Sequence, residues 1–278
     1  MTVPEFERIV TLVRRWTGVS IPHAKKGIVE GQVQDLIRAH GFASCRALLE
    51  AVDAGDPAVQ SALIDALMTN ETLFFRDRQP FEEFSTLMLP QLHAVRAREV
   101  PIRIWSAASA SGQEAYSLAM LVHESRHLIG TRRVEIFASD ISKTMITKAR
   151  AGKYSSFEVQ RGLSAARLIR HFEQVGLQWK IKPEIAGMVR FEQVNLTEDF
   201  NRLPHFDIIF CRNVMMYFEN ETRRRLIGQL ACHLRPDGFL VLGGAESILH
   251  LSGLFQPYSP THVSCVRTPM ARKRALSA

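Results

Sequence analysis

A turn made of very small residues is the first candidate ligand site in this chain of 278 residues. Residues 106–112 read Ser-Ala-Ala-Ser-Ala-Ser-Gly and follow the apolar run 102–105. Side chains of this size let a ligand approach the backbone closely, although a tight structural turn would have the same composition. The turn lacks the G-x-G-x-x-G pattern of dinucleotide sites, so it favours a ligand without a diphosphate.

Two further apolar runs end on residues that suit an adenosine ligand. Asp140 ends the run 134–139, where a carboxylate can accept hydrogen bonds from both ribose hydroxyls, although an Asp there could also cap a helix. Asn195 follows the run 189–194. Its amide both donates and accepts, so it could meet an adenine edge or simply form a turn.

A third polar ending, Arg212-Asn213, closes the apolar run 206–211. A buried strand seldom ends on such residues unless they face a cleft. In a doubly wound sheet, ligands bind beyond the carboxyl ends of the strands. The four strand ends together therefore predict an adenosine-binding site.

The elements that would position these residues alternate between strands and helices from about residue 100 onward. Such alternation predicts a mainly parallel sheet covered on both faces. Residues 152–188 break the rhythm and predict an insertion of helix plus a short hairpin. In the first 68 residues the pattern is helical, since Phe6, Ile9, Val13 and Trp16 recur at helix spacing. The expected strands are 102–105, 134–139, 189–194, 206–211, 239–243 and 262–266, and the expected helices of the sheet region are 113–129, 142–151 and 219–234.

Composition and charge narrow the class of protein. Hydrophobic content of 46% with 23% charged residues is typical of a globular domain, and no apolar run approaches the roughly 18 residues that cross a membrane. The start of the sequence lacks a basic and apolar secretory signal, so we expect a cytoplasmic protein. Four widely separated cysteines form no CxxC pair, so we expect reduced thiols and no metal site. The net charge of +7 favours an acidic partner.

Seven segments, in the same order, resemble the chemotaxis receptor methyltransferases, the CheR family. The resemblance spans nearly the whole chain. Its segments are 69–76, 105–108, 112–117, 137–141, 210–218, 234–238 and 243–247.

This resemblance implies S-adenosylmethionine as the cofactor, with S-adenosylhomocysteine as its product. Asp140 would hold the ribose, and Asn195 with Leu196 the adenine. Arg76 and Glu114 would meet the charged methionine end, and Tyr217 would stand near the transferring methyl group, so that Arg76 and Tyr217 are the candidate catalytic residues. The full set of implied cofactor contacts is Asn70, Thr72, Arg76, Ala108, Glu114, Asp140, Asn195, Leu196, Arg212 and Asn213.

The resemblance also implies the fold and the substrate. It predicts a small all-helical domain over residues 1–68, followed by a Rossmann-like α/β methyltransferase domain over 69–278 with a small antiparallel β-subdomain inserted at about 172–194. The implied enzyme is a monomeric protein-glutamate O-methyltransferase. It would form methyl esters on the cytoplasmic helical domains of chemoreceptors, to whose membrane-bound arrays it would be recruited.

Two positions depart from the family pattern. The family commonly has Glu-Glu-Pro where this chain has Gln113-Glu114-Ala115, so the candidate cofactor glutamate is retained. The loop around Gly176 looks short. In the family, a short loop there goes with enzymes that do not need the receptor's C-terminal pentapeptide tether.

Two alternatives stay open from the residues alone. A nucleic-acid methyltransferase would suit the positive charge, but it needs a base-flipping pocket with aromatic stacking partners. The residues after Cys211 read Arg-Asn-Val-Met and offer no such platform. A non-catalytic adaptor that binds S-adenosylmethionine is the other alternative, and the intact cofactor positions disfavour it.

Overall fold

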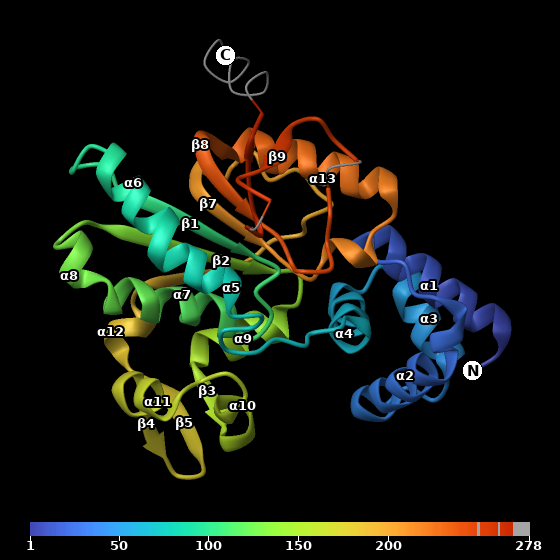
Figure 1. Cartoon of the computed structure of the whole chain (residues 1–278). Helices are drawn as coiled ribbons and strands as arrows, with labels where there is room; N and C mark the ends of the chain where they lie inside the picture. The colour runs from blue at the N-terminus through green and yellow to red at the C-terminus, as the bar shows by residue number, and fades with distance from the viewer. Residues whose placement is uncertain (249–250, 261, 269–278) are drawn as a thin grey trace.

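A computed structural model describes residues 1–248, 251–260 and 262–268. The chain begins as a helical domain that lies to one side of the rest of the molecule (Figure 1). Thr2 and Glu5 form a capping box that starts the first helix, and Gly18, in the left-handed conformation, ends it. Phe6, Ile9 and other apolar side chains of these helices pack together in a common core. The elements are α1 (Val3–Thr17), η1 (His23–Lys25), α2 (Lys26–His40), α3 (Cys45–Asp53) and α4 (Pro57–Leu67).

The second part of the chain is built on a seven-stranded sheet in the order β6-β2-β1-β7-β8-β10-β9. The first five strands of that order are parallel, and β10 and β9 are antiparallel additions at one edge. This arrangement confirms the predicted mainly parallel sheet. The strands are β1 (Ile102–Ala107), β2 (Val134–Asp140), β6 (Val189–Gln193), β7 (Phe206–Cys211), β8 (Leu234–Val241), β9 (Phe255–Pro257) and β10 (Ser264–Arg267).

Helices cover both faces of this sheet, as predicted (Figure 1). One core contains Ile104 and Phe210 with residues of α7 and α9, and a second core contains Trp105 and Cys211 with residues of α13. Neighbouring residues of one strand point to opposite faces, so β1, β2, β7, β8 and β10 each contribute to both cores. The helices and turns of this part are α5 (Gln79–Glu83), η2 (Phe84–Met88), α6 (Leu89–Val95), α7 (Gln113–Glu124), α8 (Arg126–Ile129), α9 (Lys143–Ala151), η3 (Met215–Tyr217) and α13 (Asn220–His233).

A three-stranded antiparallel sheet is inserted between β2 and β6, and its position corrects the predicted range of 172–194. It consists of β3 (Lys153–Ser155), β4 (Phe172–Val175) and β5 (Gln178–Ile181), in the order β3-β5-β4. Residues 189–193 instead form β6 of the large sheet. The prediction missed β3 because three residues carry no readable alternation and pair only with a distant strand. Short helices accompany this subdomain: α10 (Ser156–Gln160), α11 (Ala165–His171) and α12 (Pro183–Ala186).

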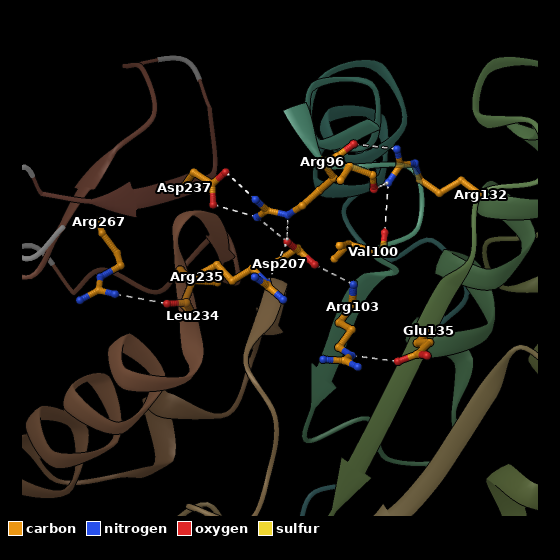
Figure 2. Close-up of polar contacts among 11 residues, drawn as sticks. Arg96, Val100, Arg103, Arg132, Glu135, Asp207, Leu234, Arg235, Asp237 and Arg267 are labelled. Atoms are coloured by element: carbon orange, nitrogen blue, oxygen red, sulfur yellow. Dashed lines mark hydrogen bonds and ion pairs between the residues drawn. The ribbon is translucent and has the colours of Figure 1, made fainter. Parts of the chain in front are cut away.

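A network of charged side chains lies at the amino ends of β1 and β7 (Figure 2). The Asp207 carboxylate is fully buried and accepts hydrogen bonds from Arg96 Nε at 2.7 Å and from the backbone N–H of Arg103 at 2.8 Å. Arg96 also donates to both oxygens of Asp237, and Arg235 lies 3.4 Å from Asp207. Through this one buried carboxylate, β7 is therefore joined to three other segments: the end of α6, β1 and β8.

Among the described residues, no helix combines the length and the apolar character that crossing a membrane requires.

Candidate active site

The main candidate pocket opens beyond the carboxyl ends of the parallel strands β1, β2, β6 and β7. It encloses about 960 Å³ free of protein atoms, part of it open to solvent at the mouth. All eleven candidate catalytic and cofactor-binding residues lie on its wall: Asn70, Thr72, Arg76, Ala108, Glu114, Asp140, Asn195, Leu196, Arg212, Asn213 and Tyr217.

The turn of small residues after β1 has a strained backbone. Ala108 and Ala110 have φ angles of 59° and 46°, in the left-handed region that non-glycine residues seldom adopt. The turn is held there because Ser109 N–H donates to the Ser139 carbonyl oxygen at 2.8 Å. Both strained alanines line the pocket. Their small side chains leave the backbone exposed to a ligand, which favours the binding interpretation of this turn over the purely structural one.

Asp140 ends β2 with a carboxylate that is largely buried and still able to accept more hydrogen bonds. Its Oδ1 accepts from Ser142 N–H at 2.9 Å and its Oδ2 from Ala110 N–H at 2.8 Å. A carboxylate has about four acceptor positions, so about two remain for the pocket, which fits the two hydroxyls of a ribose. The helix-cap alternative is excluded, because the side chain that caps α9 is that of Ser142.

The environment of Asp140 predicts a pH dependence of cofactor binding. Burial raises the pKa of the Asp140 carboxyl above its ordinary value, although N–H donors from Ser142 and Ala110 favour the charged form. Only the ionised form accepts from both hydroxyls, so affinity is lost as pH falls through the raised pKa. We expect S-adenosylhomocysteine affinity, measured by titration calorimetry between pH 8 and 5, to fall by up to about tenfold per pH unit below that pKa. The Asp140→Asn variant, which keeps all other titrating groups, should bind more weakly but with a flat profile; an equal slope in both proteins would contradict the assignment.

Asn195 lies on the pocket wall, and its side chain is hydrogen-bonded to other parts of the protein. The amide nitrogen donates to the Trp16 carbonyl oxygen at 2.7 Å and to Glu198 at 3.0 Å. The amide oxygen accepts from the backbone N–H and the hydroxyl of Thr197. All of its donors and acceptors have partners within the protein in this structure, and a contact of Asn195 with an adenine edge stays a prediction. The amide joins the end of α1 to the segment that follows β6.

The helical domain supplies pocket residues that the sequence did not identify. Thr17 and Val19, at the end of α1, line the pocket. Between them, a Cβ atom at Gly18 would lie only 2.6 Å from Thr197 Cγ2, so this close approach of the two domains requires glycine. Nothing in the local pattern of α1 signals such a contact, since the partner lies far along the chain. Ala110 belongs to the candidate turn 106–112, and the other lining residues that were not named as candidates are Met68, Thr69, Glu71, Leu73, Ile141, Val194, Val214 and Phe218.

Arg212 is the most tightly held cation of the site. Its guanidinium donates to Glu114 at 2.9 Å, to Asp77 at 2.7 Å and to the Arg76 carbonyl oxygen at 3.0 Å. The side chain is only 1% exposed. Ser106 Oγ donates to the other oxygen of Glu114 at 2.8 Å. Glu114 is thus fixed at the pocket wall and still has acceptor positions for a ligand ammonium group.

Arg76 and Tyr217 lie at half-buried positions on the wall. Arg76 donates to the Glu71 carbonyl oxygen, and it forms no ion pair with any carboxylate of the described residues. Tyr217 is positioned by the helical domain, since Ser20 N–H donates to its carbonyl oxygen at 2.9 Å and Lys25 Nζ lies 5.9 Å from its ring centre. Each could therefore meet a ligand that enters this pocket.

Two models of one protein family match most of the chain. Residues 70–263 match the model of the CheR methyltransferase S-adenosylmethionine-binding domain, and residues 4–68 match the model of the CheR methyltransferase all-alpha domain. The chain belongs to the CheR methyltransferase family. It is thus an S-adenosylmethionine-dependent methyltransferase, and this cofactor is the adenosine ligand that the strand ends indicated.

Curated relatives match along most of their length. Chemotaxis protein methyltransferase 1 of Pseudomonas aeruginosa is 35% identical over 91% of this chain and 93% of its own. Chemotaxis protein methyltransferase of Vibrio parahaemolyticus is 39% identical over 86% of this chain and 87% of its own. Among solved structures, the glycopeptide N-methyltransferase MtfA complexed with sinefungin aligns over 70% of this chain and 62% of that chain, with 16% identity and a TM-score of 0.38. That last likeness is too distant to inform the function.

Proposed function

We propose that this CheR family member transfers a methyl group from S-adenosylmethionine to glutamate side chains on the cytoplasmic domains of chemoreceptors. The products are glutamate methyl esters, formed during chemotactic adaptation. The observation that carries the proposal is a single pocket that gathers all eleven candidate residues. The names of the curated relatives, chemotaxis protein methyltransferases, support the choice of substrate.

Each part of the cofactor has a matching group on the pocket wall. Asp140 would accept from the ribose, and the buried side chain of Leu196 would pack on the adenine. Glu114 would accept from the ammonium group of the methionine end, and Arg76 would pair with its carboxylate. Bound there, the cofactor supplies a methyl group activated by the positive charge of its sulfonium.

The substrate glutamate needs little chemical activation. With an ordinary pKa near 4.3, its carboxylate is already an anion and a nucleophile at neutral pH. The residues of the pocket therefore contribute positioning and exclusion of water, which can lower a barrier by roughly 7–11 kcal/mol in favourable cases. Tyr217 would stand beside the reacting carboxylate. Its backbone contact with Ser20 means that the helical domain helps to place it.

We further propose that the enzyme finds its receptor without a pentapeptide tether. The hairpin of β4 and β5 is joined by only Gly176 and Leu177, which supports the short loop seen in the sequence. The proposed working form is a cytoplasmic monomer recruited to membrane-bound receptor arrays. Its net charge of +7 suits acidic receptor helices.

Radiolabelled S-adenosylmethionine tests the reaction directly. We expect label to enter a purified receptor cytoplasmic fragment and to be released by mild base as methanol, because methyl esters are base-labile. A fragment whose methylation-site glutamates are replaced by glutamine is the matched control and should take up no label. Cofactor binding without transfer would favour the adaptor alternative, and label in RNA or DNA would favour the nucleic-acid alternative.

The same assay tests tether independence. Receptor fragments with and without a C-terminal pentapeptide should be methylated with kcat/KM values within about twofold, since a tether would otherwise raise the effective substrate concentration. A tenfold or greater loss on removal of the pentapeptide would contradict this part of the proposal.

A further inference from the structure

The Glu246 carboxylate accepts hydrogen bonds from four backbone N–H groups. Its Oε2 accepts from Asn213 at 2.7 Å and from Gly243 at 2.9 Å. Its Oε1 accepts from Val214 at 2.9 Å and from Met215 at 2.8 Å. A carboxylate offers about four acceptor positions, so this one is fully used by the protein backbone.

Three of these donors are consecutive amides in the segment 213–217, which follows β7 and includes η3. Asn213 has a φ angle of 58°, and a run of N–H groups that converge in this way forms a small concave site for an anion. The conformation of the segment therefore depends on a negative charge, and Glu246 supplies it. Within the described chain Glu246 is not among the residues that line the pocket, whereas Asn213, Val214 and Tyr217 are.

The turn that carries Glu246 is shaped for this contact. Glu246 N–H donates to the Gly243 carbonyl oxygen at 2.9 Å, which closes the turn. A Cβ atom at Gly243 would lie 2.8 Å from both Asn213 Nδ2 and Glu246 Oε2, so a side chain here would displace this contact. The two segments meet because β7 and β8 are neighbours in the sheet and their carboxyl ends share one edge.

We propose that Glu246 is a positioning residue, which holds the segment 213–217 in the conformation that binds the cofactor and presents Tyr217 to the reaction. The proposal rests on the proposed function only for the role of Tyr217, because Asn213 and Val214 belong to the cofactor pocket itself.

The test compares Glu246→Gln with Glu83→Gln. Glutamine keeps the shape of the side chain, but its single carbonyl oxygen accepts about two hydrogen bonds, and its NH2 group would face N–H donors. Glu83 is the matched control, since its buried carboxylate also accepts backbone N–H groups, those of Val263 and Ser264, away from the pocket. Affinity for S-adenosylhomocysteine is measured by calorimetry well below the Tm of each variant. We expect at least tenfold weaker binding for Glu246→Gln and a change within twofold for Glu83→Gln, even though both lower Tm.

Two further measurements separate positioning from a general loss of stability. Glu246→Asp keeps the charge and should recover part of the affinity lost in Glu246→Gln. Backbone amides of residues 213–215 should exchange hydrogen faster in Glu246→Gln than in Glu83→Gln. A folded Glu246→Gln that binds within twofold of wild type would overturn the proposal. If that variant does not fold, wild-type affinity in Glu246→Asp despite faster exchange of the amides 213–215 would overturn it, because the segment would then be loosened without effect on binding. A wild-type protein that binds S-adenosylhomocysteine but methylates no receptor would contradict the proposed function and leave this comparison valid.

Discussion

Replacing Asp207 with alanine is expected to lower the free energy of unfolding by about 3–5 kcal/mol. The carboxylate is fully buried, and its removal would leave the guanidinium groups of Arg96 and Arg235 without their shared anion (Figure 2). It would also leave the backbone N–H of Arg103 without its acceptor. Arg96 would keep its pair with Asp237, but a charge that loses one of its two anions and a buried N–H without an acceptor cost more than an exposed pair contributes, so this effect should exceed that of surface substitutions.

Urea denaturation followed by circular dichroism measures the loss. Asp35→Ala is the control, because Asp35 forms an ion pair with Arg38 in which both side chains are 74% exposed, and such pairs contribute little. We expect that control to change stability by less than about 0.5 kcal/mol. Since the network lies at the amino ends of the strands, opposite the pocket, folded Asp207→Ala should bind S-adenosylhomocysteine as wild type does. A stability change as small as the control's would show that the network is dispensable.

Replacing Arg212 with alanine is expected to weaken S-adenosylhomocysteine binding at least about 100-fold, which corresponds to about 3 kcal/mol. The guanidinium is held by two carboxylates and one carbonyl oxygen. Its loss would leave the carboxylate of Glu114, which is partly buried, without a cation. It would also release the backbone of residues 76–77 at the pocket wall. Both the donor set and the shape of the site should change.

Arg212→Lys is the sharper version of this test, and calorimetric titration is again the measurement. A lysine keeps the charge but cannot reach Glu114, Asp77 and the Arg76 carbonyl oxygen with a planar fork of donors. We expect a loss of at least about tenfold, against less than twofold for Arg225→Lys, where the exposed guanidinium only donates to the Thr197 carbonyl oxygen. Wild-type affinity in Arg212→Lys would show that charge alone is sufficient at this position.

Most helices and strands, and the edge of the sheet that carries the site, could be predicted from local patterns in the sequence. Asp140 and Arg212 follow apolar runs, and the carboxyl ends of parallel strands share one edge, so their meeting in a single pocket could be predicted. The strand β3 could not be predicted, because three residues are too few to show the alternation of apolar and polar side chains that marks a strand. Its partner, β5, also lies in another part of the sequence. For the same reason the β-subdomain was predicted to start too late, at about residue 172, although the insertion itself was correctly expected over 152–188.

What the sequence by itself determined is the family, the cofactor and the set of residues at the strand ends, since these depend on residue type and on position along each strand. Only the tertiary structure decided the partners of those residues. It assigned the Asn195 amide to Trp16, 179 positions away, and the Glu246 carboxylate to the amides 213–215. It likewise placed Arg96 beside Asp207. Polar groups that leave water must find partners wherever the packed chain brings donors and acceptors together, and no local pattern records which distant groups those will be.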